Sequence, residues 1–244
     1  MTKIRNIFLT ATFLLVLGGL QAASAAMFDV TLGNDTPGFA DPSIPPVTGV
    51  GSIAAAQTGQ ELPFNQSCGA DVVPNPGDCS TSWKFSYGAT SDPILSASLT
   101  IGIVDHDSAA SGSQVGLFSL DGGSLTAALD NEFEAAGGLD GMYNVYSLSL
   151  SAGFFAGLAD GSAMVMLALQ GNGLQTCTSS FACSGETLPF VSETNFNGAN
   201  LIFSTLTIET QDIPPIPLPA AAPLFLSALF IMGIYRRRVL RNEA

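Results

Sequence analysis

The segment IVDHDS, residues 103–108, places an aspartate on either side of the only histidine in the chain. Asp105 and Asp107 have the D-x-D spacing of loops that wrap a hard cation, and calcium binds through carboxylate oxygens. An EF-hand does not fit, because counting from Asp105 puts Ala110 at the sixth position and Gly116 at the twelfth, where that loop needs glycine and glutamate. The pair therefore indicates either a calcium site of another kind or ordinary turn residues.

Other acidic residues share this ambiguity. Tight turns favour aspartate before glycine, and the glycine-rich nonapeptide repeat of calcium-binding β-helices is absent. Calcium is therefore a candidate cofactor that the sequence neither requires nor excludes. The residues concerned either alternate along the chain or precede a glycine: Asp130, Glu132, Glu134, Asp121, Asp140 and Asp160.

His106 would have to serve any Ser-His-Asp site, since the chain has no other histidine. The flanking carboxylates would raise its proton affinity. The G-x-S-x-G, H-E-x-x-H and P-loop patterns are all absent, so we expect His106 to lie exposed in a turn and the protein not to be an enzyme. A secreted polysaccharide or ester hydrolase remains an alternative, because two of the many carboxylates could serve a glycosidase.

Aromatic residues alternate along two strand-like segments. Trp83, Phe85 and Tyr87 share one face of the segment SWKFSY, and Tyr143 and Tyr146 lie on a second segment. An exposed aromatic face would suit a carbohydrate, whereas a buried one would be core. We expect core packing, and keep a calcium-assisted carbohydrate-binding module as an alternative function.

The four cysteines, Cys68, Cys79, Cys177 and Cys183, form two local pairs in the sequence. An even number of cysteines in an exported chain is typical of disulfides. Three connectivities are open, and local pairing predicts Cys68–Cys79 and Cys177–Cys183. A structural zinc site is not expected, because neither spacing is C-x2-C and only one histidine is present.

The elements that must position these residues read mainly as strands. The clearest, residues 93–105, puts Leu95, Ala97, Leu99, Ile101 and Ile103 on one face. Helix is expected only within 130–138 and 154–159, and residues 33–51 read as a Pro/Gly-rich connection. The pattern predicts an antiparallel β-sandwich, jelly-roll-like in its order of strands and loops. The expected strands are 28–32, 82–87, 93–105, 115–120, 143–150, 162–170 and 200–210.

The charge is strongly negative and unevenly distributed. The chain has a formal charge of −13. The region between the two ends contains 19 of the 20 acidic residues, and Lys84 is its only basic residue. Nucleic acid binding needs clustered lysine and arginine. We therefore expect no nucleic acid partner.

The N-terminal segment, residues 1–25, reads as a secretory signal peptide. Lys3 and Arg5 precede a short apolar run, and Ala23-Ser24-Ala25 is a signal-peptidase pattern, which predicts cleavage before Ala26. The folded ectodomain is then expected over residues 26–212.

The C-terminal segment reads as a membrane helix preceded by prolines. Residues 213–219 form a proline-rich linker, because proline fixes φ and removes an amide donor. Residues 220–235 are uncharged, and as a helix they would extend about 24 Å, a short span for a bilayer core of about 30 Å. The basic tail 236–244 starts with three arginines, which the positive-inside rule holds on the cytoplasmic side. The arginines are Arg236, Arg237 and Arg238.

This tail resembles the VPLPA-CTERM sorting signal of the PEP-CTERM class in Gram-negative bacteria. The resemblance covers about 30 residues of the chain and departs from the pattern at its first position, where isoleucine replaces valine. It implies that an exosortase-type membrane peptidase recognises the motif and releases the protein from the inner membrane. A permanent single-span anchor is the alternative. The motif residues are Ile216, Pro217, Leu218, Pro219 and Ala220.

Together these features predict an exported protein with a structural or adhesive role. It would pass through an inner-membrane intermediate and then reach the cell surface or the extracellular matrix, where exopolysaccharide is the expected partner. The tail says nothing about the activity of the ectodomain, since proteins with such tails carry many different ectodomains.

Overall fold

A computed structural model describes residues 25–41, 50–70, 76–137, 141–177 and 190–211. They belong to one compact unit, Ala25–Gln211. The predicted signal peptide up to residue 24, the linker 213–219, the span 220–235 and the tail 236–244 lie outside the described residues. Within the described ranges, no helix combines the length and the apolar character that a membrane crossing requires.

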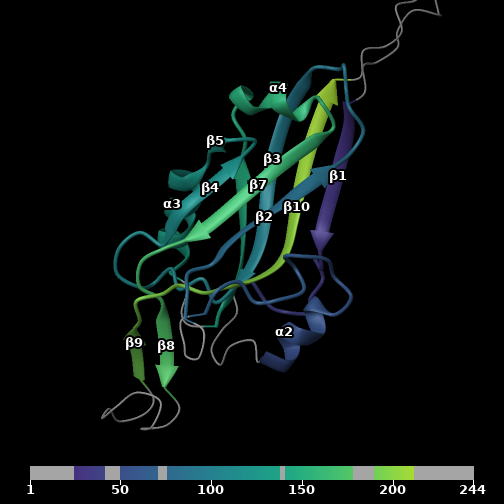
Figure 1. Ribbon diagram of the computed structural model, residues 1–244. Coiled ribbons are helices and arrows are strands. Elements are labelled where there is room, and N and C mark those ends of the chain that lie inside the picture. The colour runs from purple at the N-terminus through teal and green to yellow at the C-terminus, as the bar shows by residue number, and fades with distance from the viewer. Residues whose placement is uncertain (1–24, 42–49, 71–75, 138–140, 178–189, 212–244) are drawn as a thin grey trace, which may run out of the picture. The chain divides into compact units, whose positions relative to one another are not determined.

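The unit consists mainly of two antiparallel four-stranded sheets (Figure 1), which confirms the predicted fold class at this level. The first sheet has the order β1-β10-β3-β6, and the second has the order β2-β7-β4-β5. A separate hairpin pairs β8 with β9. The strands are β1 (Ala25–Gly33), β2 (Ser80–Ser86), β3 (Ile94–Val104), β4 (Val115–Leu120), β5 (Gly123–Ser124), β6 (Tyr143–Ser149), β7 (Ser162–Leu169), β8 (Leu174–Cys177), β9 (Phe190–Glu193) and β10 (Asn200–Gln211).

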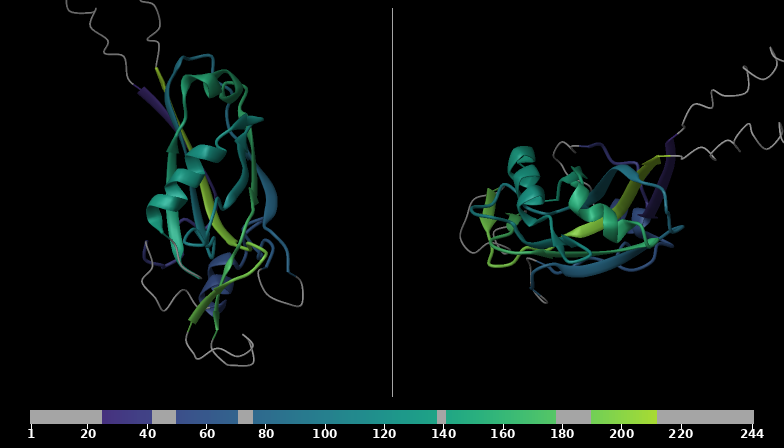
Figure 2. Two further views of the ribbon diagram at one scale, coloured as in Figure 1. Left: turned by 90° about the vertical axis from the view of Figure 1, so that its left-hand side faces the viewer. Right: turned by 90° about the horizontal axis from the view of Figure 1, so that it is seen from above.

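The two sheets share one hydrophobic core, and Figure 2 shows them as stacked layers. Alternate residues of each strand face this core, as the period of two in a strand requires. Trp83 and Phe85 of β2 are buried in it together with Leu99 of β3 and Leu206 of β10. The aromatic stripe predicted on 82–87 is therefore core, and its two buried rings offer no platform for a sugar.

One residue of the predicted core face of β3 points elsewhere. Leu95 is exposed, whereas the apolar residues that follow it on that face are buried. The pairing explains the difference, because Glu209 pairs with Ser96 while the next residue, Thr210, pairs with Ile94. Leu95 is the extra residue of this β-bulge, which changes the face that a side chain takes.

Helix α3 (Thr126–Ala136) overlaps the predicted region 130–138 but begins four residues earlier, and α4 (Phe155–Leu158) lies within the predicted region 154–159, preceded by the 3-10 turn η1 (Ala152–Phe154). Helix α2 (Val50–Gln57) was not predicted, since its glycine and proline neighbours indicate a loop. Ile53 of α2 packs with Tyr143 and Phe203 in a small second core on the outer face of the first sheet. Tertiary packing of this kind stabilises a helix too short to be stable alone.

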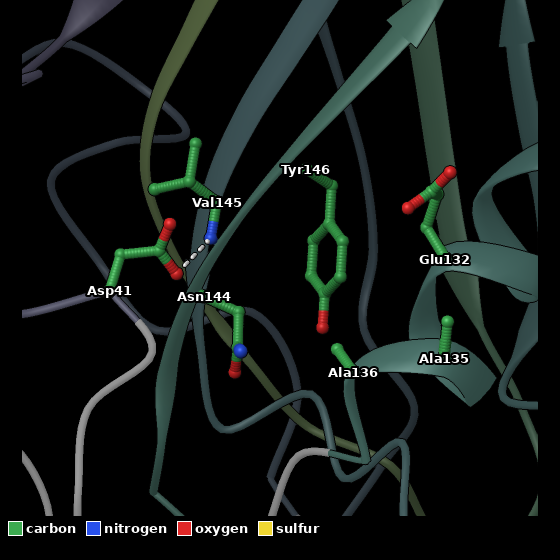
Figure 3. Close-up of a pocket in the computed structure, with 7 residues that line it drawn as sticks. All are labelled: Asp41, Glu132, Ala135, Ala136, Asn144, Val145 and Tyr146. Atoms are coloured by element: carbon green, nitrogen blue, oxygen red, sulfur yellow. Dashed lines mark hydrogen bonds between the residues drawn. The ribbon is translucent and has the colours of Figure 1, made fainter.

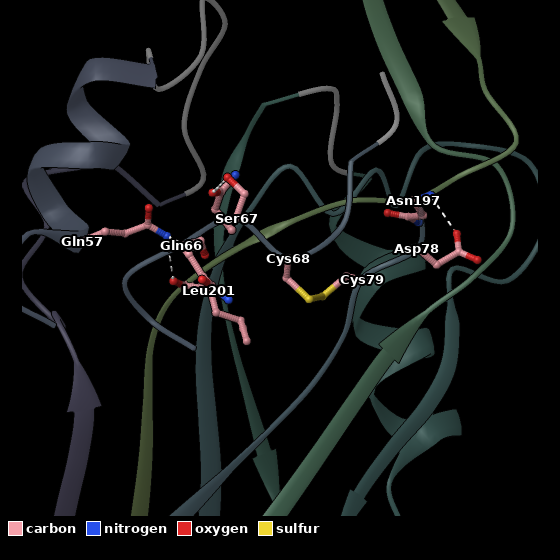
Figure 4. The surroundings of a disulfide bond; sticks show 9 residues. Gln57, Gln66, Ser67, Cys68, Asp78, Cys79, Asn197 and Leu201 are labelled. Atoms are coloured by element: carbon pink, nitrogen blue, oxygen red, sulfur yellow. Dashed lines mark hydrogen bonds between the residues drawn. A yellow bond between two sulfur atoms is a disulfide. The ribbon is translucent and has the colours of Figure 1, made fainter. Parts of the chain in front are cut away.

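The Cys68–Cys79 disulfide is formed, as predicted, with the two Cα atoms 4.7 Å apart. The bond joins two segments that both pair with the segment before β10. Cys68 forms a β-bridge with Ala199, and the amide of Cys79 donates to the carbonyl of Asn197. Figure 4 shows the surroundings of the bond. Both sulfur-bearing side chains are buried. The second predicted bond, Cys177–Cys183, lies outside the described side chains and stays a prediction.

Removing the Cys68–Cys79 bond with a double Cys→Ser substitution should lower the free energy of unfolding by about 2–3 kcal/mol, the cost expected for releasing a short loop in the unfolded chain. The bonded residues are 11 positions apart. Urea unfolding of the oxidised wild type and the variant measures the difference. Dithiothreitol should destabilise the variant further only if Cys177 and Cys183 are also bonded. A variant as stable as the oxidised wild type would contradict the prediction.

Candidate functional site

A pocket of about 350 Å³ opens beside the start of β6 (Figure 3). Three parts of the chain that are distant in sequence form it: the segment after β1, the end of α3 and the first residues of β6. Its size is that of a site for a small organic molecule. The lining residues are Asp41, Glu132, Ala135, Ala136, Asn144, Val145 and Tyr146.

Asp41 is held at the rim by the backbone of β6. Its Oδ1 accepts a hydrogen bond from the amide of Val145 at 3.1 Å, drawn as the dashed line in Figure 3. Two residues earlier, the ring of Phe39 packs edge-to-face on Tyr143 with centroids 5.2 Å apart. These two contacts hold the segment that follows β1 against β6, and they fix the carboxylate of Asp41 at the pocket.

Asn144 and Tyr146 form the inner wall. The side chain of Asn144 is 3% exposed, and its Oδ1 accepts no hydrogen bond from any described residue. A buried acceptor without a donor costs about 1–3 kcal/mol. Because the terminal torsion of asparagine is broad and roughly two-fold, the amide can turn this oxygen toward a donor in the pocket.

Helix α3 supplies the opposite wall and ends there. Ala135 and Ala136 are its last two residues, and Gly137 closes the helix in the left-handed conformation with φ 60°. The last carbonyl groups of a helix carry partial negative charge. No basic residue lies in the last turn of α3 to neutralise it.

The pocket is therefore electrically negative. Burial raises the pKa of the Tyr146 hydroxyl, a hydrogen bond from Ser108 lowers it, and the carboxylates of Asp41 and Glu132 raise it further. Tyr146 thus stays a neutral phenol at physiological pH. None of the described lining residues is basic, and Lys84 lines a different pocket, of about 280 Å³, beside Trp83.

His106 lies behind this wall, and the expectation of an exposed turn histidine is wrong. Its side chain is 0% exposed. Its Nε2 bonds to the hydroxyl of Tyr146, and its ring packs edge-on against Phe133 at 4.4 Å between centroids. Asp105 and Asp107 both have positive φ, 65° and 51°, so the tight turn directs the residue between them into the core. Burial lowers the pKa of His106 to about 3, the opposite of the expected increase.

The two flanking aspartates do not share an open loop. Asp105 accepts a hydrogen bond from the amide of Gly141 at 2.6 Å, and Asp107 is buried. Among the residues in the described ranges, no group of three or more His, Cys, Asp or Glu side chains is placed to hold a metal ion. A calcium site at Asp105 and Asp107 stays a prediction that would need further oxygen ligands, since calcium takes about 6–8.

Other carboxylates, in turns and on α3, bond to backbone amides. Asp121 accepts from the amide of Met164 at 2.8 Å, and Asp130 accepts from the amides of Gln114 and Val115 at 3.1 and 3.2 Å. Asp160 likewise accepts from Ser162. These acids join neighbouring loops and strands, so much of the negative charge of the domain has a structural role.

Asn197 is a buried polar residue that no sequence pattern indicates. Its Nδ2 donates to Oε1 of Gln114 at 2.5 Å, and its backbone amide donates to Asp78 Oδ1 at 2.9 Å (Figure 4). It therefore ties the segment before β10 to the disulfide and to the loop before β4.

No family model and no curated protein matches this chain.

The buried histidine should make stability depend on pH. Because the pKa of His106 is about 3 in the folded protein and about 6.5 in an unfolded chain, the unfolded state takes up the proton first. This contribution to the free energy of unfolding should be fully present above pH 6.5. Below pH 6.5 the free energy of unfolding should fall by about 1.4 kcal/mol per pH unit until about pH 3.

Urea midpoints between about pH 6.5 and 5 give the clean comparison, since carboxylates of ordinary pKa remain ionised there. His106→Gln should flatten the slope in that window. An equal slope in this variant would assign the effect to other groups.

Proposed function

We propose that the protein is an exported, non-enzymatic component of the cell surface or extracellular matrix with an adhesive or structural role. The observation that carries the proposal is the pairing of the two ends of the domain. Ala25 lies opposite Gln211 in the β1–β10 ladder. The predicted signal-cleavage site and the predicted sorting tail therefore both connect to the same end of the domain.

The strand order supports a display module. Apart from the β4–β5 pair, neighbouring strands in both sheets are distant in sequence, and the chain crosses between the sheets after β1, β2, β3, β5 and β6. We infer that this is a jelly roll, which pairs eight strands in two such sheets. The architecture leaves loops at both ends of the sandwich, where a binding surface can vary without disturbing the core.

The pocket lies toward the end of the domain opposite Gln211. Tyr143, at the start of β6, pairs with Val104, and Val104 pairs with Asn200 at the start of β10. The predicted tail continues from the other end of β10. A domain held by its tail would thus present the pocket away from its attachment, which is the arrangement that adhesion needs.

The hydrolase alternative is less well supported. His106 is fully buried and bonded to Tyr146, so a nucleophile that used it as a base would have no open side for substrate. Because burial raises the pKa of Tyr146, its hydroxyl stays protonated near neutral pH and is not available as a general base.

Two measurements on cells that carry a matching peptidase test the proposal. Mass spectrometry of the mature surface protein should find the C-terminus near Ala220, and replacing Arg236, Arg237 and Arg238 with serine should send unprocessed protein into the medium. The released protein should also sediment with isolated exopolysaccharide. A mature chain that still ends in Ala244 would replace sorting by permanent anchoring. A processed protein without affinity for the matrix or for cells would overturn the adhesive role.

A further inference from the structure

We propose that the pocket between α3 and β6 binds the protonated primary amine of an amino sugar, such as a hexosamine unit of exopolysaccharide that lacks its N-acetyl group. The inference deepens the proposed adhesive function and rests on it for the source of the sugar. The geometry that carries it is the meeting of two carboxylates, one unsatisfied carbonyl oxygen and a helix C-terminus around one cavity (Figure 3).

The polar groups of the pocket call for a donor with positive charge. Asp41 and Glu132 are acceptors, and Asn144 has a buried Oδ1 with no donor from the described residues. A primary ammonium group offers three N–H donors and no acceptor. The lining thus offers acceptors of the right kind, with Asp41 and Asn144 on one side of the Tyr146 ring and Glu132 on the other (Figure 3).

The end of α3 adds a second, independent attraction for a cation. Ala135 and Ala136 line the pocket and are the last residues of an 11-residue helix. The carbonyl groups of the last turn favour positive charge. A neutral sugar would gain little from this field, and an anionic one would be repelled by it.

The size and the apolar part of the lining favour an organic cation over a bare metal ion. Two carboxylates and one amide oxygen fall short of the shell of about 6–8 oxygens that calcium takes. The lining also includes the apolar residues Ala135, Ala136 and Val145. The cavity of about 350 Å³ has room for a sugar ring, whose C–H face suits an apolar lining.

Isothermal titration calorimetry of the mature protein with oligosaccharides of equal length tests the proposal. The titrations are run at low ionic strength and at a pH below the pKa of the sugar amine. Glucosamine oligomers should bind, and N-acetylglucosamine oligomers of equal length should bind at least about 10-fold more weakly, because the acetylated nitrogen has lost its charge. Added sodium chloride should weaken the binding of the amine. Calcium chloride and spermidine serve as the other two arms.

Glu132→Gln should weaken the amino sugar about 10-fold, and the matched variant Glu134→Gln should bind as the wild type does. Both residues are exposed on α3, and only Glu132 lines the pocket. Thermal unfolding should be the same for both variants, since neither side chain is part of the core.

Three outcomes would overturn the inference: equal binding of the acetylated oligomer, calcium or spermidine binding in place of the sugar, or no effect of Glu132→Gln. Protein that sediments with exopolysaccharide but shows one of these outcomes would keep the adhesive function and lose only this ligand. Protein that binds glucosamine oligomers but not the matrix would show the reverse.

Discussion

Phe133→Ala should lower the free energy of unfolding by about 3–5 kcal/mol, the usual cost of deleting a buried aromatic side chain. Phe133 is 0% exposed and projects from α3 into the main core. Its ring lies 4.4 Å from that of His106 and 4.8 Å from that of Tyr146, centroid to centroid. The substitution therefore removes transfer free energy and the contacts that hold the back wall of the pocket. Urea unfolding near neutral pH measures the loss.

Phe133→Leu is the control for this prediction, since it keeps most of the apolar volume and should cost clearly less. The alanine variant should also show a smaller pH slope below pH 6.5, because a cavity beside His106 would lessen its burial. A loss below about 1 kcal/mol for Phe133→Ala would mean that α3 contributes little to the core, contrary to the packing described above.

Gly33→Ala should destabilise the domain by about 2–5 kcal/mol, from two causes that add. Gly33 has φ +81°, a conformation that costs a residue with a Cβ about 1–2 kcal/mol. A Cβ there would also lie 2.8 Å from the Cα of Phe203 and 2.9 Å from the ring of Phe64. The first neighbour is backbone of β10 and cannot move away without breaking the β1–β10 pairing.

Gly38→Ala separates the two causes. Gly38 has nearly the same φ, +82°, but a Cβ there would meet no atom within 4 Å. Its substitution should cost only the conformational part, about 1–2 kcal/mol. Equal losses for the two variants, measured by urea unfolding, would show that the close approach of β1 to β10 does not matter.

The long strands of the two sheets were predictable because their cause is local, whereas the short strands β5, β8 and β9 were not predicted. Residues 115–120 were predicted as a strand and form β4 with the same bounds, since alternation and short apolar runs report directly which face is buried. Helix α2 was not predictable in this way. Its segment VGSIAAAQ follows a Pro/Gly-rich stretch, and the contact that stabilises it comes from Phe203, about 150 residues later in the chain.

The candidate site was beyond the reach of local patterns for the same reason. The sequence marks Glu132 as one of several alternating acids and Tyr146 as an aromatic residue of a strand. Neither pattern indicates that the two line one cavity with Asp41 and Asn144. His106 shows the limit most clearly. Its neighbours in sequence are two carboxylates, which favour a charged ring, whereas its neighbours in space are Phe133 and Tyr146, which favour a neutral one.

The position of β10 has a mechanical consequence for a protein that is held by its C-terminal tail. Tension on the tail would pull β10 along its own axis, out from between β1 and β3, to which it is paired along almost its whole length. Hydrogen bonds loaded in this shear direction share the force and must break together, whereas a peeled strand would lose them one at a time. We expect single-molecule pulling from the C-terminus to give a higher rupture force than pulling across the free edge of β1. Under the proposed anchoring, the last strand before the tail would also be the one placed to resist detachment.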